Sequence, residues 1–434
     1  MVIIFCDQKT ARIEYTFGLV FRELLGVNYV ITTDNEEYRN AQGPKIWYST
    51  APCPEGICFV PAGLLSSRGI NSLEPECITY DELVCLFPVK GKSELPYDPF
   101  SATFYMVSRY EEYLPFRPDA HGRFTAKDSF ASKNGFLHKP MVNYWAKHVG
   151  DLLNVNYPDF LVPGTRYSFT LSVDIDAAWA FRHKGLLRTV GGLGKALTKL
   201  DFKEISRRQR VLEGKQKDPF DTFNLLFNYQ RRQALDMICF ILLGDYGPYD
   251  KNISWQNYHF QDLIKRIGDY ATLGIHPSYQ SSSQPDLIKQ EMERLQKITR
   301  KPVVKSRQHY LRLQFPTTYR ALIALGIEDD YSMGFADDYG FRAGICSPYY
   351  FYDLELEQMS RLRIFPFAFM DGTLKDYLKL SPAEADEIIQ QLIIEVRKAN
   401  GTFISLWHNE SLSNEDRWVG WKEVCDKMIE IGNR

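Results

Sequence analysis

The sequence has no strong excess of charge of either sign: its 434 residues carry 52 Lys and Arg against 54 Asp and Glu, a formal net charge of -2. A protein that binds nucleic acid mainly through its charge needs a basic excess, so we expect no nucleic-acid partner. No apolar run reaches the roughly 20 residues that a membrane-spanning helix requires. The first residues, M-V-I-I-F-C-D-Q-K, lack a basic segment followed by an apolar stretch and a cleavage site, so we expect no secretory signal.

The eight cysteines include no C-x-x-C pair, a spacing common in zinc-binding and redox motifs. The two closest are Cys53 and Cys58. In the absence of an export signal, the simplest interpretation is that the cysteines are reduced, buried thiols and form neither disulfides nor a zinc cluster. These observations predict a cytoplasmic protein.

The length and the 44% hydrophobic content are sufficient for two or three domains. Residues 1–160 open with V-I-I-F, a helical stretch from Tyr15 to Leu25 and the strand-like N-Y-V-I-T-T, which predicts a smaller N-terminal α/β domain of unknown role. In residues 161–434, apolar strand-like runs alternate with amphipathic helical runs such as Asp286–Thr299 and Pro382–Asn400. Such dense alternation predicts a mainly parallel sheet, either open or closed into a barrel.

The strand expected at S-F-T-L-S-V-D-I-D, residues 168–176, alternates apolar and small residues and then ends in two carboxylates, Asp174 and Asp176. Other expected strands also end in polar residues. In a parallel sheet the carboxyl ends of all strands lie at the same edge, so these side chains are expected to converge. The complete set of strand-end residues is Asp174, Asp176, Asp245, His276, Arg307, His309, Asp371 and His408.

Aspartate and histidine side chains are ligands for divalent transition metals, and three protein ligands with one open position are typical of a catalytic site. Such a metal lowers the pKa of bound water and polarises a carbonyl oxygen. A second carboxylate beside it can act as a base, and a histidine across the site as an acid. The strand-end residues therefore suggest hydrolysis of an amide or an ester.

Residues from about 165 to 430 resemble the polysaccharide deacetylases of carbohydrate esterase family 4, which carry the NodB homology domain on a distorted (β/α) barrel. The resemblance lies in the order of the motifs D-I-D, T-L-G-I-H-P-S-Y-Q, R-Q-H-Y and L-W-H. Together with G-F-R-A-G, they are most similar to an uncharacterised bacterial branch that has its own N-terminal domain. The resemblance implies a C-terminal NodB-type (β/α) barrel that removes acetyl groups from a carbohydrate.

The resemblance further implies Asp174 as the catalytic base and Asp176 as a metal ligand, although the two roles could be exchanged. The family's second motif has two histidines, but here His276 is followed by Gln280 at the distal position, and glutamine is a poor zinc ligand. His309 is our candidate to complete the ligand set. A divalent metal, most simply zinc, would then be held by Asp176, His276 and His309, while a site with two ligands or without metal stays open.

By the same resemblance, His408 is the general acid that protonates the leaving amine or alcohol. Arg307 could orient Asp174 through a bidentate pair, or it could form an ordinary buried ion pair. Asp371 could hold His408 in one tautomer or cap a turn. Tyr279, Tyr310 and Trp407 suit stacking on sugar rings and are the candidate substrate-binding residues.

Residues 177–220 form a basic insertion that begins directly after the D-I-D motif. Leucines at positions 186, 187, 193, 197 and 200 give it amphipathic character, and Lys195 is one of its many cations. It could be a solvated helical excursion, or a lid that contacts an anionic or lipid-linked glycan at a membrane surface.

The sequence therefore predicts a metal-dependent carbohydrate N- or O-deacetylase. One alternative is a non-catalytic carbohydrate-binding or scaffold protein on the same fold, with a degenerate metal site at Gln280. A second alternative is a hydrolase of a small cyclic amide, because relatives of this barrel also act on such substrates.

Overall fold

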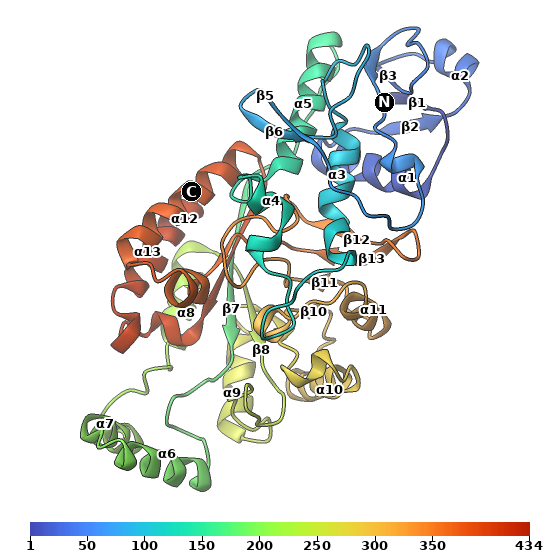
Figure 1. Cartoon of the computed structure of the whole chain (residues 1–434). Coiled ribbons are helices and arrows are strands. Elements are labelled where there is room, and N and C mark those ends of the chain that lie inside the picture. Colours follow the sequence, from blue (N-terminus) through green and yellow to red (C-terminus); the bar gives the residue numbers. More distant parts are fainter.

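The computed structural model describes the backbone of residues 1–434 and the side chains of all of them except residues 186, 187, 193, 195 and 196. The leucines at 186, 187 and 193 and Lys195, which contribute to the predicted amphipathic insertion, lie outside the described side chains. Figure 1 shows most of residues 1–160 at one end of an elongated molecule, while the segment around Arg123 reaches the middle, where Arg123 donates to the carbonyl oxygen of Tyr310.

The N-terminal region contains a four-stranded parallel sheet with the strand order β2-β1-β3-β4. Its strands are β1 (Val2–Cys6), β2 (Tyr29–Thr32), β3 (Lys45–Tyr48) and β4 (Ile57–Phe59). Helix α1 (Ala11–Phe17) continues into a π-helix (Gly18–Leu24), so the predicted βαβ opening is present. Also in this region are the antiparallel hairpin β5 (Cys77–Tyr80) and β6 (Leu83–Leu86), and the helices α2 (Asn35–Asn40), α3 (Pro99–Val107), α4 (Phe130–Lys133) and α5 (Met141–Asn156).

The C-terminal region is built on a nine-stranded sheet with the order β12-β13-β11-β10-β9-β8-β7-β15-β14. All neighbours in it are parallel except the antiparallel pair β12–β13. The strand order is linear from β12 to β14, so the predicted closure into a barrel stays a prediction. The strands are β7 (Ser168–Ile175), β8 (Asp236–Ile241), β9 (Thr272–Ile275), β10 (Lys305–Ser306), β11 (Asp329–Asp330), β12 (Tyr349–Asp353), β13 (Gln358–Ile364), β14 (Phe369–Met370) and β15 (Thr402–His408).

Helices connect most of these strands, as the alternating pattern predicts. They are α6 (Leu186–Thr198), α7 (Phe202–Leu212), α8 (Phe223–Gln233), α9 (Tyr258–Ile267), α10 (Asp286–Thr299), α11 (Thr317–Ala324) and α12 (Pro382–Lys398). Helix α13 (Trp421–Gly432) follows the last strand. Helix α12 shows why the sequence forms a helix here: Ser381 and Glu384 make a reciprocal capping box, and Pro382 occupies the first turn. Its apolar stripe, including Ile389 and Leu392, is buried.

Strand β7 lies between β15 and β8, and all of its residues after Ser168 are buried. Its side chains therefore face two separate packed layers. One is the large core cluster, which contains Leu171 and Val173. The other is a smaller cluster against the opposite face of the sheet, made of Ile238, Phe240, Leu311, Tyr331, Ala336, Phe367, Ile404 and Leu406. The register sets Asp174 opposite both His408 and Phe240, so polar strand ends lie at the edge of this smaller cluster.

The two regions share buried contacts. Glu112, after α3, pairs with Arg109 at 2.8 Å and with Arg342 of the C-terminal region at 2.5 Å, and all three side chains are almost completely buried. Arg12 of α1 pairs with Glu357 at 2.5 Å. The large apolar core also contains residues from both regions. The domain boundary near residue 160 therefore stays a prediction.

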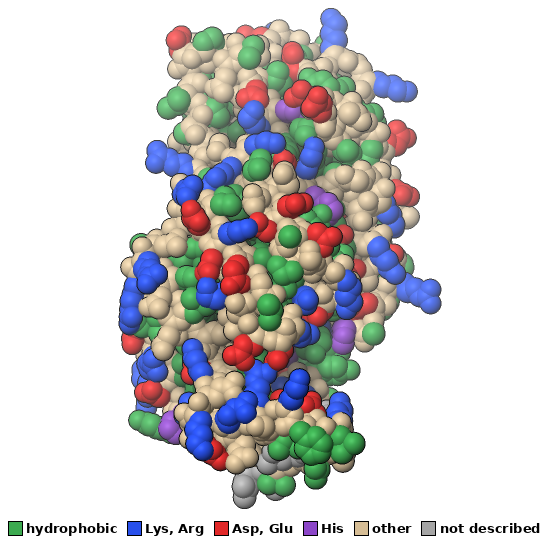
Figure 2. Space-filling model, turned by 90° about the vertical axis from the view of Figure 1, so that its left-hand side faces the viewer, with side chains coloured by type: hydrophobic (Ala, Val, Ile, Leu, Met, Phe, Trp, Pro, Cys, Tyr) green, Lys and Arg blue, Asp and Glu red, His purple; other side chains and the backbone are tan. Residues whose placement is uncertain are grey.

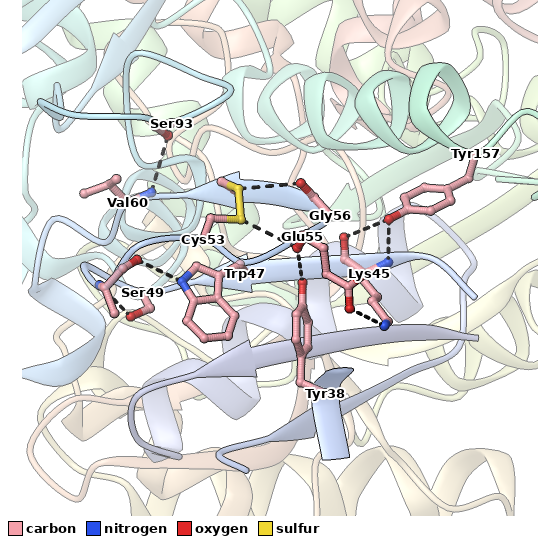
Figure 3. The surroundings of a disulfide bond; sticks show 12 residues. Tyr38, Lys45, Trp47, Ser49, Cys53, Glu55, Gly56, Val60, Ser93 and Tyr157 are labelled. Carbon is pink, nitrogen blue, oxygen red and sulfur yellow. Dashed lines mark hydrogen bonds and ion pairs between the residues drawn. A yellow bond between two sulfur atoms is a disulfide. The ribbon is translucent and has the colours of Figure 1, made fainter. Parts of the chain in front are cut away.

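The prediction that the cysteines are reduced is wrong for one pair, because Cys53 and Cys58 form a disulfide with their Cα atoms 6.1 Å apart (Figure 3). Strands β3 and β4 are parallel, so the loop between them must return alongside the sheet, which brings Cys53 back to Cys58 in β4. The six other cysteines are free. The cysteines thus no longer favour a reducing compartment, and the cytoplasmic location stays a prediction.

Across the part of the chain that the structure describes, no helix has both the length and the apolar character needed to cross a bilayer.

Candidate active site

Side chains from several strand ends converge on one cavity of about 450 Å³. Asp174 lies in β7 and Asp176 directly follows it, and both reach the cavity because residues two apart on an extended segment point to the same face. His276 directly follows β9, and His408 ends β15. His309 lies in a short 3-10 turn shortly after β10. The residues lining the cavity include Asp174, Asp176, His276, His309, Tyr310 and His408.

Asp176, His276 and His309 offer one ligand atom each, and these atoms all lie within 4.8 Å of one another. Asp176 Oδ1 is 3.3 Å from His276 Nε2, and Asp176 Oδ2 is 3.4 Å from His309 Nε2. Two ligands bound to one zinc ion at tetrahedral angles are about 3.3 Å apart. Asp176 Oδ1 is buried and has no hydrogen-bond partner among the described residues. One carboxylate and two imidazoles in this arrangement fit a divalent transition metal.

The second nitrogen of each imidazole is held by another group. His276 Nδ1 is 2.6 Å from the carbonyl oxygen of Arg307, and His309 Nδ1 is 2.8 Å from Asp250 Oδ1. A carbonyl oxygen only accepts hydrogen bonds, so Nδ1 of His276 carries the proton. Nε2 of His276 is the nitrogen that faces Asp176 and could bind a metal. Orientation of a histidine through its other nitrogen is typical of metal ligands.

The charges in this group shift its pKa values. Burial raises the pKa of Asp176, but His309, His276 and His408 outweigh it and hold this pKa well below its usual range. Burial lowers the pKa of His309, yet Asp176 and Asp250 raise it to about 9. Asp176 is therefore ionised near neutral pH, as a ligand must be. Binding of a metal to His309 must displace a proton.

Asp174 is paired with Arg307, and both are almost completely buried. Arg307 Nη1 donates to Asp174 Oδ1 at 3.0 Å, and Arg307 Nε donates to the carbonyl oxygen of Tyr331 at 2.9 Å. Arg307 Nη2 has no partner among the described residues, so the pair is not the bidentate contact that the sequence suggested. The guanidinium lies over the rings of Phe240 and Phe367, at 4.5 and 5.6 Å from their centroids. Arg307 thus holds Asp174 beside His276, whose Nε2 is 3.6 Å from Asp174 Oδ2.

His408 has a similar support on the other side of Asp176. Its Nδ1 is 2.7 Å from Asp371 Oδ1, and its backbone N–H donates to Asp371 Oδ2 at 2.7 Å. Its Nε2 is 3.7 Å from Asp176 Oδ2. Burial by itself lowers the pKa of His408, but Asp371, Asp176 and Asp174 raise it well above its usual value. Asp371 therefore orients His408, and it also accepts the N–H of Gly372 in the turn.

The three predicted substrate-binding aromatics have different environments. Tyr310 lines the cavity. Tyr279 is half-buried, its hydroxyl 3.2 Å from His121 Nδ1, and its ring stacks on Tyr249, another cavity residue. Trp407 is 0% exposed and packs edge-on against Phe369, so it cannot contact a ligand in the cavity. Alternation along β15 explains this correction, because its neighbour His408 faces the cavity.

Asp250 is a site residue that the sequence analysis missed. It lies in the loop before α9, is 2% exposed, and accepts the N–H of Tyr279 in addition to its contact with His309. No strand or motif marks it. Asp245, which does follow β8, instead pairs with Arg294 and has a side chain that is 73% exposed, outside the cavity lining. Gln280 is also exposed and lies in a 3-10 turn.

Residues 2–158 match the model of a family of unknown function, DUF7033. A search among curated proteins found no match. Among solved structures, the chain is similar to a protein from Mycobacterium smegmatis whose name reads polysaccharide deacetylase, with 13% identity, 63% of this chain and 87% of that chain covered, and a TM-score of 0.40.

Two further similar structures carry the same name. For the polysaccharide deacetylase of Bacillus cereus the identity is 12%, the coverage 62% of this chain and 88% of that chain, and the TM-score 0.31. For a protein of that name from Pseudomonas aeruginosa PAO1 the values are 9%, 62%, 84% and 0.38.

Proposed function

We propose that this protein is a metal-dependent hydrolase that removes acetyl groups from a carbohydrate. One observation carries the proposal: Asp176, His276 and His309 form a compact ligand group, with the supported pairs Asp174–Arg307 and His408–Asp371 beside it in the same cavity. A ligand group, a base and an acid are the parts that hydrolysis of an amide or ester needs. The order of the sequence motifs supports the same reaction.

In this proposal Asp176 Oδ1 and the Nε2 atoms of His276 and His309 hold a divalent metal, most simply zinc. Such an ion lowers the pKa of bound water and polarises the acetyl carbonyl group. Asp174 accepts a proton from the attacking water, and Arg307 keeps its carboxylate in place. His408 donates a proton to the leaving amine or alcohol.

The proposed substrate is an acetylated glycan whose sugar rings contact Tyr310 and Tyr249 at the cavity. Lys184, Lys251 and Arg417 also line the cavity, which suits a glycan that carries an anionic group. The substrate that the protein turns over will show whether the acetyl group is removed from nitrogen or from oxygen.

The test combines metal analysis with acetate release. The purified protein is expected to contain a stoichiometric transition metal, and to release acetate from N-acetylated or O-acetylated glycans after loading with zinc. The variant His276→Ala is expected to lose both the metal and the activity. The control His259→Ala removes an exposed histidine of α9 that is not among the cavity residues, and is expected to keep both.

Two other results would replace the proposal. Binding of a glycan without metal and without acetate release would indicate a carbohydrate-binding protein with a degenerate site. Turnover of a small cyclic amide with no activity on acetylated sugars would indicate an amide hydrolase that uses the same residues.

A further inference from the structure

The basic insertion forms a helical hairpin that we define as residues 182–217, which contain α6 and α7. It carries eleven Lys and Arg and only three Asp and Glu, whereas the whole chain has a net charge of -2. Figure 1 shows α6 and α7 at the lower left, apart from the other helices. The hairpin is therefore a strongly positive element attached to a nearly neutral molecule.

Arginines of both hairpin helices make polar contacts with the rest of the protein, and Val211 of α7 is buried. Arg188 of α6 donates to the carbonyl oxygen of Asn252 at 2.7 Å, and its guanidinium lies 4.2 Å from the ring centroid of Tyr246. Arg207 of α7 pairs with Glu415 and Asp416. The hairpin thus contacts the rest of the chain through arginines of both helices.

The two helices approach each other at Gly192. A Cβ atom at that position would lie 2.2 Å from Arg208 Nη1 of α7. Gly192 and Arg188 are four residues apart and share one side of α6, so α7 and the protein body both lie on that side.

The apolar side of α6 points in the other direction. Val190 and Leu197 are seven residues apart, on one face of the helix, and are 59% and 58% exposed. Leu200, in the turn before α7, and Phe202, the first residue of α7, are 70% and 65% exposed. An amphipathic helix on a protein surface normally buries its apolar stripe against the core, and this helix presents it to the surroundings. Figure 2 shows apolar and basic side chains gathered together at this end of the molecule.

The hairpin also carries exposed cations, and Lys199 and Lys203 flank Leu200 and Phe202 in the sequence. The exposed cations are Arg182, Lys199, Lys203, Arg210, Lys215 and Lys217, against two exposed acidic residues in the hairpin, Asp201 and Glu213. Exposed leucine and phenylalanine beside lysine and arginine are typical of helices that lie in the interface of an anionic bilayer. Lysine and arginine interact with acidic headgroups, while the apolar side chains enter the boundary of the acyl chains.

We propose that the hairpin docks this protein on the surface of an anionic lipid bilayer, with Val190, Leu197, Leu200 and Phe202 inserted and the exposed lysines of the hairpin on the headgroups. The docking does not depend on the proposed hydrolysis. Lys184, at the start of the hairpin, lines the cavity, so docking also brings the cavity close to the bilayer. If the proposed function holds, a lipid-linked glycan would meet the site there.

Co-sedimentation of the full chain with vesicles tests the docking. We compare vesicles of phosphatidylcholine alone with vesicles of phosphatidylcholine and phosphatidylglycerol. The wild type is expected to bind the anionic vesicles, to bind the neutral ones much more weakly, and to be released by salt. The double variant L197E/L200E is expected to lower the partition coefficient at least about tenfold. The double variant K199Q/K203Q is expected to lower it by about 30-fold on anionic vesicles only.

A matched control changes two other exposed apolar residues, Val155 and Leu161, which are 76% and 80% exposed in the N-terminal region and its linker. V155E/L161E is expected to bind like the wild type. The changed side chains are exposed in the wild type, and circular dichroism is used to check that each variant is folded. Neither hairpin variant changes a residue of the cavity lining, so acetate release from a soluble glycan reports separately on the proposed function.

Three results would overturn the docking. The first is the absence of binding to anionic vesicles. The second is an equal loss of binding in V155E/L161E and L197E/L200E. The third is a wild-type dimer in light scattering that L197E/L200E dissociates, which would make the apolar face a contact between two copies of this chain.

Discussion

Asp250 Oδ1 lies 2.8 Å from His309 Nδ1, across 59 residues of sequence, while His309 Nε2 lies 3.4 Å from Asp176. A loop carboxylate thus orients a candidate metal ligand. Asp250 is itself held by the N–H of Tyr279, at 2.9 Å. The position of His309 therefore depends on a residue outside the strands.

Replacement of Asp250 tests this relationship. D250A is expected to weaken zinc binding about 10- to 100-fold, because His309 loses the group that fixes its ring and raises its basicity. D250N is expected to have a smaller effect, since the amide oxygen can still accept a hydrogen bond. Zinc competition titrations measure the affinity. The control D245N neutralises an exposed carboxylate outside the cavity, and unchanged affinity in D250A would contradict the role.

Arg307 is predicted to be essential for stability as well as for orienting Asp174. R307M is expected to lower the free energy of unfolding by about 3–5 kcal/mol, because it leaves the buried carboxylate of Asp174 without its partner. Denaturant titrations measure this change. The control K147M breaks the exposed pair of Lys147 with Asp151 and is expected to cost less than about 1 kcal/mol. A loss in R307M no larger than in the control would show that Asp174 does not depend on the pair.

His408 is expected to affect the chemical step without affecting metal content. H408Q should lower kcat by about 10²- to 10⁴-fold, the range for loss of a general acid, with little change in KM. Zinc stoichiometry should stay the same because His408 lies outside the three-residue ligand group. Loss of zinc from H408Q would instead make His408 a ligand. D371N should lower kcat as well, since it removes the charge that orients His408.

The buried carboxyl group of Glu291 is expected to make the stability of the protein depend on pH. It is 2% exposed in α10, and burial raises its pKa from 4.5 to about 7. The folded protein therefore binds this proton more tightly than the unfolded chain, so the contribution of Glu291 to stability is largest below pH 4.5 and falls as the pH rises to 7. At 1.36 kcal/mol per pKa unit the fall is about 3 kcal/mol.

E291Q, which resembles the protonated form, should remove this part of the pH dependence. We expect the variant to unfold like the wild type near pH 4 and to be more stable than it near pH 8. Parallel pH profiles of the unfolding free energy for both proteins would contradict the assignment.

The disulfide gives a prediction about thiol content. The denatured protein, kept unreduced, should react with a thiol reagent at six cysteines, and at eight after reduction. The variant C53S/C58S should show six in both conditions. Eight reactive thiols in the unreduced wild type would restore the interpretation that all the cysteines are reduced.

Local patterns in the chain were sufficient to predict several elements. The apolar stripe of α10 indicates the bounds Asp286–Thr299 that the structure has. In contrast, the polar sequence Q-M-S-R-L-R-I does not single out β13, although it pairs with both β12 and β11. Its place in the sheet depends on its pairing with β11, which is distant in the chain and which the period of its side chains does not encode.

The residues of the candidate site likewise include some that the sequence could identify and some that only the tertiary structure reveals. Asp174, Asp176, His276 and His408 could be selected from the sequence because parallel strands bring their carboxyl ends to one edge, and the alternation along β15 would also have excluded Trp407. Asp250 could not be selected, since it reaches His309 only through the packing of a loop. The direction in which α6 presents its apolar face could likewise not be predicted from the sequence. The helical period defines an apolar stripe, but the tertiary contacts of Arg188 and Gly192 decide what that stripe faces.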